Sequence, residues 1–302
     1  MMLYYIRNDN FLQGEILTMN IMLVYTFSCL ACASVNDLVF KLFARKERSR
    51  GLFVALVGLI GVICFSFLPD KFNGNLPATF IWGIICGFFS ITANIMLIES
   101  MSFLSAGICS TIYRLNLALV VPMSVLFLNE KLAWTQYAGI ALAILAVLFF
   151  LPASGKNNEG KVSKQTLLPM VIVIMAAVFR AGMGITCKYG PMQGASINGI
   201  NFIVEMIWVV CGLLYYLVRE RKKCRPDIQI CKYGAISGIL GAGIMFFMMM
   251  ALSVGNASIV LSIAQMSFLL TFILSVIFMK EKITMLKLIA MFCGAGAILL
   301  LM

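Results

Sequence analysis

The stretch SVLFLNEKL at residues 124–132 recurs as SVIFMKEKI at residues 275–283, which is 151 positions later in a chain of 302 residues. In both copies an apolar run ends near a Glu-Lys pair, and a second apolar run follows. At the same offset, residues 105–151 align with residues 256–302 without a gap, and eleven of the 47 pairs are identical. This register across two apolar segments and their charged turn indicates an internal repeat.

The composition of the chain is typical of a polytopic membrane protein. Hydrophobic residues make up 62% of the sequence, charged residues make up 12%, and the mean hydropathy is +1.01. A soluble domain of this length cannot bury that much apolar surface. The net charge of +11 is carried by short Lys and Arg clusters between apolar runs, which indicates membrane topology rather than nucleic-acid binding.

Ten apolar segments are long enough to span a bilayer, which takes about 20 residues each. They are 19–40, 51–69, 78–100, 105–128, 134–152, 167–187, 197–218, 231–252, 256–279 and 285–302. Five spans in each half is an odd number, so the second half enters the membrane in the opposite direction. We therefore expect an all-α membrane protein of ten transmembrane helices in two inverted five-helix repeats, with a binding site between the repeats.

The expected organisation has four parts. Residues 1–18 form an N-terminal tail without the layout of a signal peptide, and residues 19–152 form the first repeat. Residues 153–166, ASGKNNEGKVSKQT, form a polar linker, and residues 167–302 form the second repeat.

Basic residues are distributed unequally between the two sides of this topology. Seventeen Lys and Arg fall in or beside the loops between spans 1–2, 5–6, 7–8 and 9–10. The opposite side carries four, namely Arg7, Lys71, Lys131 and Lys188. The positive-inside rule then predicts that the first side is cytoplasmic and that both termini lie outside.

The chain lacks the residues that several other activities need. It has no His, and its ten Cys fall almost entirely inside apolar runs, including Cys29 and Cys32, so they are interpreted as small packing residues. No metal or other cofactor is expected. No GxxxxGK[ST] motif occurs, and the loops are too short for a nucleotide-binding domain, which excludes ATP-driven transport by this chain alone.

Residues 251–284, ALSVGNASIVLSIAQMSFLLTFILSVIFMKEKIT, and their weaker copy in residues 105–132 resemble the drug/metabolite transporter superfamily, specifically its EamA-like members. The resemblance implies ten helices in two inverted repeats and transport of a small metabolite through a central cavity. That cavity is lined mainly by helices 1, 3, 4, 6, 8 and 9. Two features depart from the family pattern: Ile273 stands where a second Pro equivalent to Pro122 is common, and such proteins are usually drawn with cytoplasmic termini.

Polar and ionisable residues inside the spans are the candidates for the site, because such groups are costly in a membrane and usually face a cavity or one another. The candidates for substrate binding are Arg180, Arg114, Glu99, Asn94, Asn36, Asn116, Gln265 and Tyr113. The candidates for coupling are Glu205 and Glu99.

Glu99 and Arg114 lie on either side of the tight turn between spans 3 and 4. Arg114 is then about four to six residues deeper than Glu99, or about 6–9 Å along the helix axis, which a long Arg side chain spans in large part. The pair is interpreted either as a charged clamp in the cavity or as a structural salt bridge near a helix end.

The remaining ionisable residues have competing interpretations. Arg180 is too deep in its span to reach the surface, and its planar guanidinium suits a carboxylate or phosphate group. Glu205 is either a proton-coupling carboxylate or a bond to a neighbouring helix. Asp37 and Lys41 are four residues apart, which favours an ion pair at a helix end over a cavity role.

The leading hypothesis is a secondary transporter, with export as one possible direction, for a small metabolite such as an amino acid or organic anion. Its expected partners are the substrate, the lipid bilayer and protons or another coupling solute, without nucleic acid, and the chain acts as a monomer or homodimer. It is expected in the cell membrane as a multi-pass protein and not as an enzyme. The alternatives are an intramembrane or lipid-processing enzyme and a non-transporting sensor.

Overall fold

The computed structural model describes residues 2–44, 48–100, 112–154, 164–221, 227–279 and 284–301. Within these ranges the chain is helical and contains no strand. The elements of the first half are α1 (Met2–Ala44), α2 (Arg50–Ser66), α3 (Leu76–Ser100), α5 (Leu117–Leu128) and α6 (Trp134–Ser154). Those of the second half are α7 (Lys164–Met192), α8 (Ile197–Tyr215), η1 (Tyr216–Glu220), α9 (Ile228–Val254), α10 (Ala257–Gln265), α11 (Ser267–Met279) and α12 (Met285–Leu301).

These elements form ten apolar spans, as the sequence predicts. Six stretches of the described chain are long and apolar enough to cross a membrane, and four shorter apolar helices are Arg50–Ser66, Ile112–Leu128, Trp134–Phe149 and Leu288–Leu301. The fourth span is Ile112–Leu128, which includes α5, and the ninth span comprises α10 and α11. The protein is therefore an all-α membrane protein.

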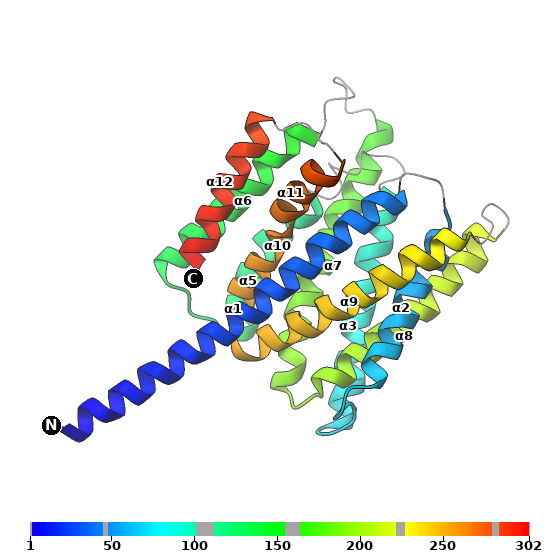
Figure 1. Cartoon of the computed structure of the whole chain (residues 1–302). Coiled ribbons are helices and arrows are strands. Elements are labelled where there is room, and N and C mark those ends of the chain that lie inside the picture. The colour runs from blue at the N-terminus through cyan, green and yellow to red at the C-terminus, as the bar shows by residue number, and fades with distance from the viewer. Residues whose placement is uncertain are drawn as a thin grey trace.

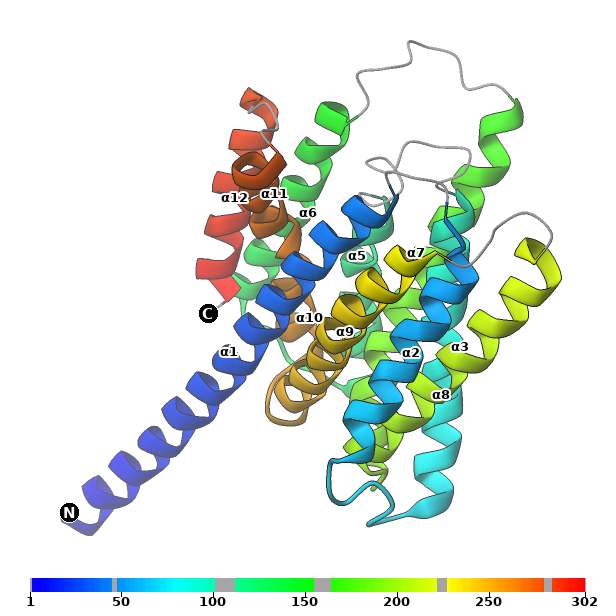
Figure 2. The ribbon, with the colours of Figure 1, turned by 45° about the vertical axis from the view of Figure 1, so that its right-hand side comes forward.

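Equivalent helices of the two halves make equivalent packing contacts. The most extensive contacts of α1 are with α9, and those of α7 are with α3, which are equivalent pairs when the halves are exchanged. The contacts of α2 with α9 and of α8 with α3 are likewise equivalent, while α2 packs on α8 and α6 packs on α12 (Figures 1 and 2). The two repeats thus interlock, and their interface runs through the centre of the molecule.

The second helix of each repeat begins with the same local chemistry. The Ser49 side chain accepts a hydrogen bond from the Leu52 N–H at the start of α2, and the Ser196 side chain accepts one from the Gly199 N–H at the start of α8. A Ser in this position satisfies one of the amide groups that the first turn of a helix leaves unpaired. The two caps are 147 residues apart, close to the offset of the sequence repeat.

Glycines allow the central helices to approach closely. A Cβ atom at Gly51 would lie 2.8 Å from the Gly212 carbonyl, and one at Gly58 would lie 2.8 Å from the Val209 nitrogen, so α2 and α8 are in backbone contact. On α9, a Cβ atom at Gly238 would lie 2.5 Å from the Ile60 Cβ of α2. The small residue at this position of α9 therefore serves close helix packing.

Some expected segments differ from the structure or lie outside it. Helix α1 begins at Met2, so it includes residues 2–18, where the sequence predicts a tail; this stretch contains no Pro to interrupt it. The first turns of α1 project beyond the other helices (Figures 1 and 2). Residues 101–111, 155–163 and 280–283, and with them most of the expected linker and the MKEKI turn, lie outside the described residues.

Two faces of the molecule are used below. The terminal face is formed by the turns at residues 67–75, 129–133, 193–196 and 255–256. The N-terminal end of α1 and the C-terminal end of α12 lie on the same side (Figure 2). The basic face is formed by the ends of α1 at Ala44, α3 at Ser100 and η1 at Glu220.

Candidate functional site

The fourth and ninth spans are interrupted at equivalent positions. In the fourth span the helix breaks at Leu115 and Asn116, and in the ninth span it breaks at Met266, which aligns with Leu115 at the offset of 151. At each break the backbone turns tightly: Leu115 N–H donates to the Ile112 carbonyl at 3.1 Å, and Met266 N–H donates to the Ile263 carbonyl at 3.0 Å. Interrupted helices at a repeat interface expose backbone groups to ligands, and many secondary transporters bind substrates there.

Arg114 joins these two breaks. Its Nη1 donates to the Gln265 carbonyl at 2.9 Å and to Ser267 Oγ at 2.9 Å, and both acceptors flank the break in the ninth span. Its Nη2 forms an ion pair with Asp37 of α1, and the guanidinium carbon lies 5.6 Å from the centre of the Phe268 ring. One cation therefore holds together three spans from both repeats.

Asp37 completes this group, which we call the interior cluster: Asp37, Arg114, Gln265, Ser267 and Thr271. Thr271 Oγ1 lies 3.3 Å from Asp37 Oδ2, the same carboxylate oxygen that Arg114 binds. The Asp37 side chain is nonetheless 36% exposed, so part of the carboxylate remains accessible. The Lys41 side chain, the expected partner of Asp37 on its own helix, lies outside the described part of the structure.

Arg180 lies near the interior cluster on α7. Its guanidinium acts electrostatically on Tyr113 of the fourth span and on Cys29 and Cys86 of α1 and α3. Among the described residues its hydrogen-bond partner is the Met183 sulfur at 3.1 Å, which is a weak acceptor for a charged donor. The buried Tyr113 hydroxyl lies close to the Arg180 guanidinium, and no hydrogen bond of good geometry joins it to a described residue. Both groups therefore retain hydrogen-bonding capacity that a ligand can fill.

Four of the other predicted residues divide between the breaks and helix packing. Asn116 lies at the break in the fourth span, and its side chain donates to the Tyr113 main-chain carbonyl at 2.9 Å. Gln265 lies beside the break in the ninth span and binds Arg114 through its main-chain carbonyl. In contrast, Asn94 donates to the Ser90 carbonyl of its own helix, and Asn36 accepts from Ser237, joining α1 to α9.

Glu99 does not pair with Arg114. Its carboxylate accepts hydrogen bonds from the Tyr215 hydroxyl and from Arg219 Nη1, both at 2.5 Å, at the basic face where α3 packs against α8 and η1. The predicted clamp is therefore wrong, because Arg114 points towards α1 and the ninth span instead. The Glu99 pair has the geometry of the structural salt bridge at a helix end.

Glu205 is isolated in the interior of α8. Its side chain is buried against Gly61 of α2, and no hydrogen bond or ion pair joins it to another described residue. Asn201, one turn away on α8, is also buried, and neither polar atom of its side chain has a partner in the described chain.

A second ionic group lies at the terminal face, and we call it the terminal-face cluster: Glu130, Lys188, Gly255, Ala257 and Ser258. The Glu130 carboxylate accepts from Lys188 Nζ at 3.1 Å, from the backbone N–H groups of Ala257 and Ser258 at 2.5 and 3.1 Å, and from Ser258 Oγ at 2.7 Å. Lys188 also donates to the Gly255 carbonyl at 2.5 Å. The carboxylate thus caps the first turn of α10 while α7 neutralises its charge.

The chemistry of this cluster fixes the charge of Glu130. Burial by itself raises the pKa of the Glu130 carboxyl. The hydrogen bonds from Ser258 and from the two backbone amides, together with the charge of Lys188, outweigh burial, so the pKa lies below its ordinary value. The Glu-Lys turn therefore does more than end a helix: α5 ends at Leu128 as predicted, and Glu130 then ties the first repeat to the second.

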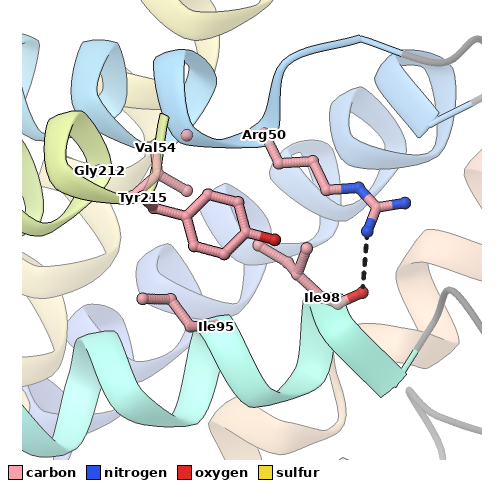
Figure 3. A pocket seen from close by; sticks show the side chains of 7 residues that line it. Arg50, Val54, Ile95, Ile98, Gly212 and Tyr215 are labelled. Carbon is pink, nitrogen blue, oxygen red and sulfur yellow. Dashed lines mark hydrogen bonds between the residues drawn. The ribbon is translucent and has the colours of Figure 1, made fainter. Parts of the chain in front are cut away.

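Two hollows lie away from the interior cluster. At the terminal face, a cavity of about 610 Å³ is lined by the 67–75 turn, by Pro191 and Asn198, and by Phe246 and Met250 of α9. Figure 3 shows a smaller pocket near the basic face, between α2, α3 and α8, where Arg50 donates to the Ile98 carbonyl. The smaller pocket holds about 10 Å³, which is room for one water molecule and not for a metabolite.

The sequence profile of the EamA-like transporter family matches residues 20–151 and 167–302, which covers both repeats. The chain belongs to the EamA-like transporter family. This assignment confirms the resemblance to the drug/metabolite transporter superfamily, and members of the family are membrane transporters.

Two known proteins are similar to this chain. An uncharacterized transporter of Archaeoglobus fulgidus is 28% identical to this chain over 120 residues, a stretch that covers 39% of this chain and 40% of that protein. A protein solved by crystallography superposes with a TM-score of 0.77 at 14% identity, covering 92% of this EamA-like chain and 94% of the other. At that identity the likeness concerns the fold.

Sequence reasoning gave several residues of the EamA-like chain another role or none, and the structure brings them together. Asp37, Ser267 and Thr271 join the interior cluster, and Lys188 joins the terminal-face cluster. A signal was present for one of them: Asp37 is an acid inside an apolar span, and the chain offers few cations at a similar depth. For the others the partner is more than 50 residues away and no spacing rule connects it.

Proposed function

We propose that this chain is a secondary active transporter of a small metabolite that carries a carboxylate, such as an amino acid or organic anion. The substrate binds between the repeats, at the breaks in the fourth and ninth spans, and the repeats alternate in opening to the two sides of the cell membrane. The site is built from Arg180 and Tyr113 with the interior cluster beside them.

The observation that carries this proposal is the state of Arg180. A guanidinium in the interior of a membrane protein needs acceptors, and a thioether is a poor one. A planar carboxylate accepts two parallel hydrogen bonds from such a fork, which makes it the natural occupant. The unpartnered Tyr113 hydroxyl offers the same ligand a further hydrogen bond.

The interior cluster supports a zwitterion in particular. Asp37 leaves part of its carboxylate accessible, so a substrate ammonium group has an acceptor close to the guanidinium groups of Arg114 and Arg180. A substrate with both charges can then be neutralised at both ends without a bare charge in the membrane. An organic anion uses Arg180 alone.

Uptake into proteoliposomes tests this function. The full chain is reconstituted and given a mixture of the twenty amino acids and common carboxylic acids, and mass spectrometry measures which compounds enter, with and without a pH gradient. Accumulation of one carboxylate compound above that in empty liposomes is the expected result. Absence of flux for every compound under both conditions contradicts the proposal. The same assay, with right-side-out and inverted protein, assigns the direction of transport.

A further inference from the structure

Asn201 and Glu205 form a pair of buried polar side chains that the substrate site does not use. They are four residues apart on α8, so they lie on one face of the helix one turn from each other. The exposed fractions are 0% for Asn201 and 5% for Glu205. Neither side chain has a hydrogen-bond partner among the described residues. Two adjacent unpartnered groups at such burial point to a ligand that the protein chain itself does not supply.

The surroundings leave space for the Glu205 carboxyl but offer it no counter-charge. It lies against Gly61 of α2, where a Cβ atom would be 2.5 Å from the carboxyl carbon, so only Gly makes this room. Within the described ranges, the ion pairs do not include Glu205, so no Lys or Arg side chain is paired with it.

The charged and titratable groups of the neighbouring helices are engaged or distant. On α2, the titratable group nearest along the helix to Gly61 is Cys64. On α3, the Cys86 thiol contacts the Cys187 thiol of α7 at 3.3 Å. Also on α7, Arg180 faces Tyr113, Lys188 binds Glu130, and Tyr189 packs on Trp82. Glu99 of α3 and Arg50 of α2 lie towards the basic face, as do Cys231, Lys232 and Tyr233 of α9.

A proton is the ligand that fits this setting. An isolated carboxylate in an apolar interior is unfavourable unless its charge is removed or paired. A bound proton removes the charge and turns the carboxyl into a hydrogen-bond donor, for which the Asn201 carbonyl oxygen, one turn away, is a ready acceptor. The proton therefore removes the unpaired charge and adds a donor one turn from an acceptor that has no partner in the described chain.

We propose that Glu205 and Asn201 form a proton-binding site, separate from the substrate site, whose loading and release drive transport. This inference rests on the proposed function. The step is the addition of one proton to the Glu205 carboxylate from one side of the membrane and its release to the other, without any redox change. Since α2 and α8 are equivalent helices that meet across the repeat interface, release of the proton requires this interface to open to water, which links the proton to the movement of the repeats.

Infrared difference spectroscopy of the full chain in lipid bilayers tests the proton site without any substrate. The carbonyl stretch of a protonated carboxyl is resolved from that of a carboxylate, and a series of spectra from acid to alkaline pH follows its loss. We expect Glu205→Gln to lose one such band that titrates in the wild type, and Asn201→Ala to shift its frequency. The matched control is Glu99→Gln, which removes an ion-paired carboxylate and leaves this band unchanged. Spectra of Glu205→Gln that equal those of the wild type at every pH overturn the proposal.

Proton movement during transport provides the second measurement. Proteoliposomes containing a trapped pH-sensitive dye receive the mixture of amino acids and carboxylic acids, and the wild type is expected to change the internal pH. Glu205→Gln is expected to lose this signal and uphill accumulation while it keeps exchange of labelled for unlabelled compounds. Proton movement by Glu205→Gln at the wild-type rate overturns the inference. If the wild type moves no compound at all, the proposed function fails, while the infrared band still decides the proton site.

Discussion

At the terminal face, the Glu130 side chain is 4% exposed and accepts four hydrogen bonds. In the interior, the Asp37 side chain is 36% exposed, and Arg180 of α7 has a thioether as its hydrogen-bond partner. Both groups join the two repeats, and both contain an acid and a base. The terminal-face cluster is satisfied by the protein alone, which is what a structural connection requires. The interior cluster and Arg180 retain hydrogen-bond donors and acceptors that the protein does not use, which is what a ligand site requires.

The comparison shows that a buried ion pair is not by itself a sign of a functional site. What distinguishes the two regions is the number of donors and acceptors left over after the protein has formed its own bonds. It also separates the two roles by experiment: variants of the terminal-face cluster should change stability, and variants of the interior should change transport.

The largest stability effect is expected for Glu130→Ala. The variant leaves Lys188 partly buried without its counter-charge and removes the acceptor for the first amide groups of α10. Removing one partner of a buried ion pair typically costs about 3–5 kcal/mol. Thermal unfolding in detergent should show a clearly lower midpoint than the wild type. Lys131→Ala changes the adjacent charge of the same turn and is the control; an equal loss in both variants contradicts the special role of Glu130.

Asp37→Asn is expected to change substrate selection. The substitution keeps one acceptor oxygen but removes the negative charge that would pair with a substrate ammonium group. Uptake of amino acids should therefore fall by about tenfold, which corresponds to about 1.4 kcal/mol, while uptake of organic anions is retained. Competition between the two classes in proteoliposomes measures the change. Asp227→Asn is the matched control, because Asn also caps a helix N-terminus and residue 227 lies outside the site. An equal loss for both substrate classes contradicts the zwitterion interpretation.

Acid should weaken the terminal-face cluster selectively. The pKa of Glu130 is lower in the folded protein than its ordinary value, so its contribution to stability is complete above that ordinary value. The contribution is lost as the pH falls through the lowered pKa. The difference in unfolding midpoint between wild type and Glu130→Gln should therefore be constant near neutral pH and shrink under strongly acidic conditions. A difference that grows on acidification has the wrong sign for this account.

The smallest effect is expected for Arg219→Ala. Arg219 pairs with Glu99 at the basic face, but its side chain is 62% exposed, and water competes for such a pair. Both the unfolding midpoint and the uptake rate should remain close to those of the wild type. A large loss of uptake in this variant would return Glu99 to the candidate site.

Much of the architecture was predictable because it follows from local patterns in the sequence. The apolar runs and the offset of 151 predict ten spans and two equivalent halves, and Arg114 and Arg180 stand out as charges inside apolar segments. The breaks at Leu115 and Met266 were not predicted, since neither has a Gly or Pro at the break itself. Hydrophobicity and spacing determine helices, whereas breaks and ion pairs depend on which helices become neighbours.

Glu99 illustrates the limit of spacing arguments. Its separation from Arg114 across a tight turn made a pair geometrically reasonable, but the two side chains point to different neighbouring helices. Glu130 illustrates the converse, because its partners on α7 and α10 are far away in the sequence and only the repeated Glu-Lys pair indicated that the turn matters.

The most direct test of the account compares Arg180→Gln with Arg219→Gln in the proteoliposome uptake assay, at equal amounts of folded protein. Both variants replace an arginine by the same uncharged side chain, but one lies in the interior and the other at the basic face. We predict that Arg180→Gln abolishes uptake of the carboxylate substrate without a change in the unfolding midpoint, while Arg219→Gln retains it. Uptake by Arg180→Gln at the wild-type rate would contradict the placement of the substrate site between the repeats.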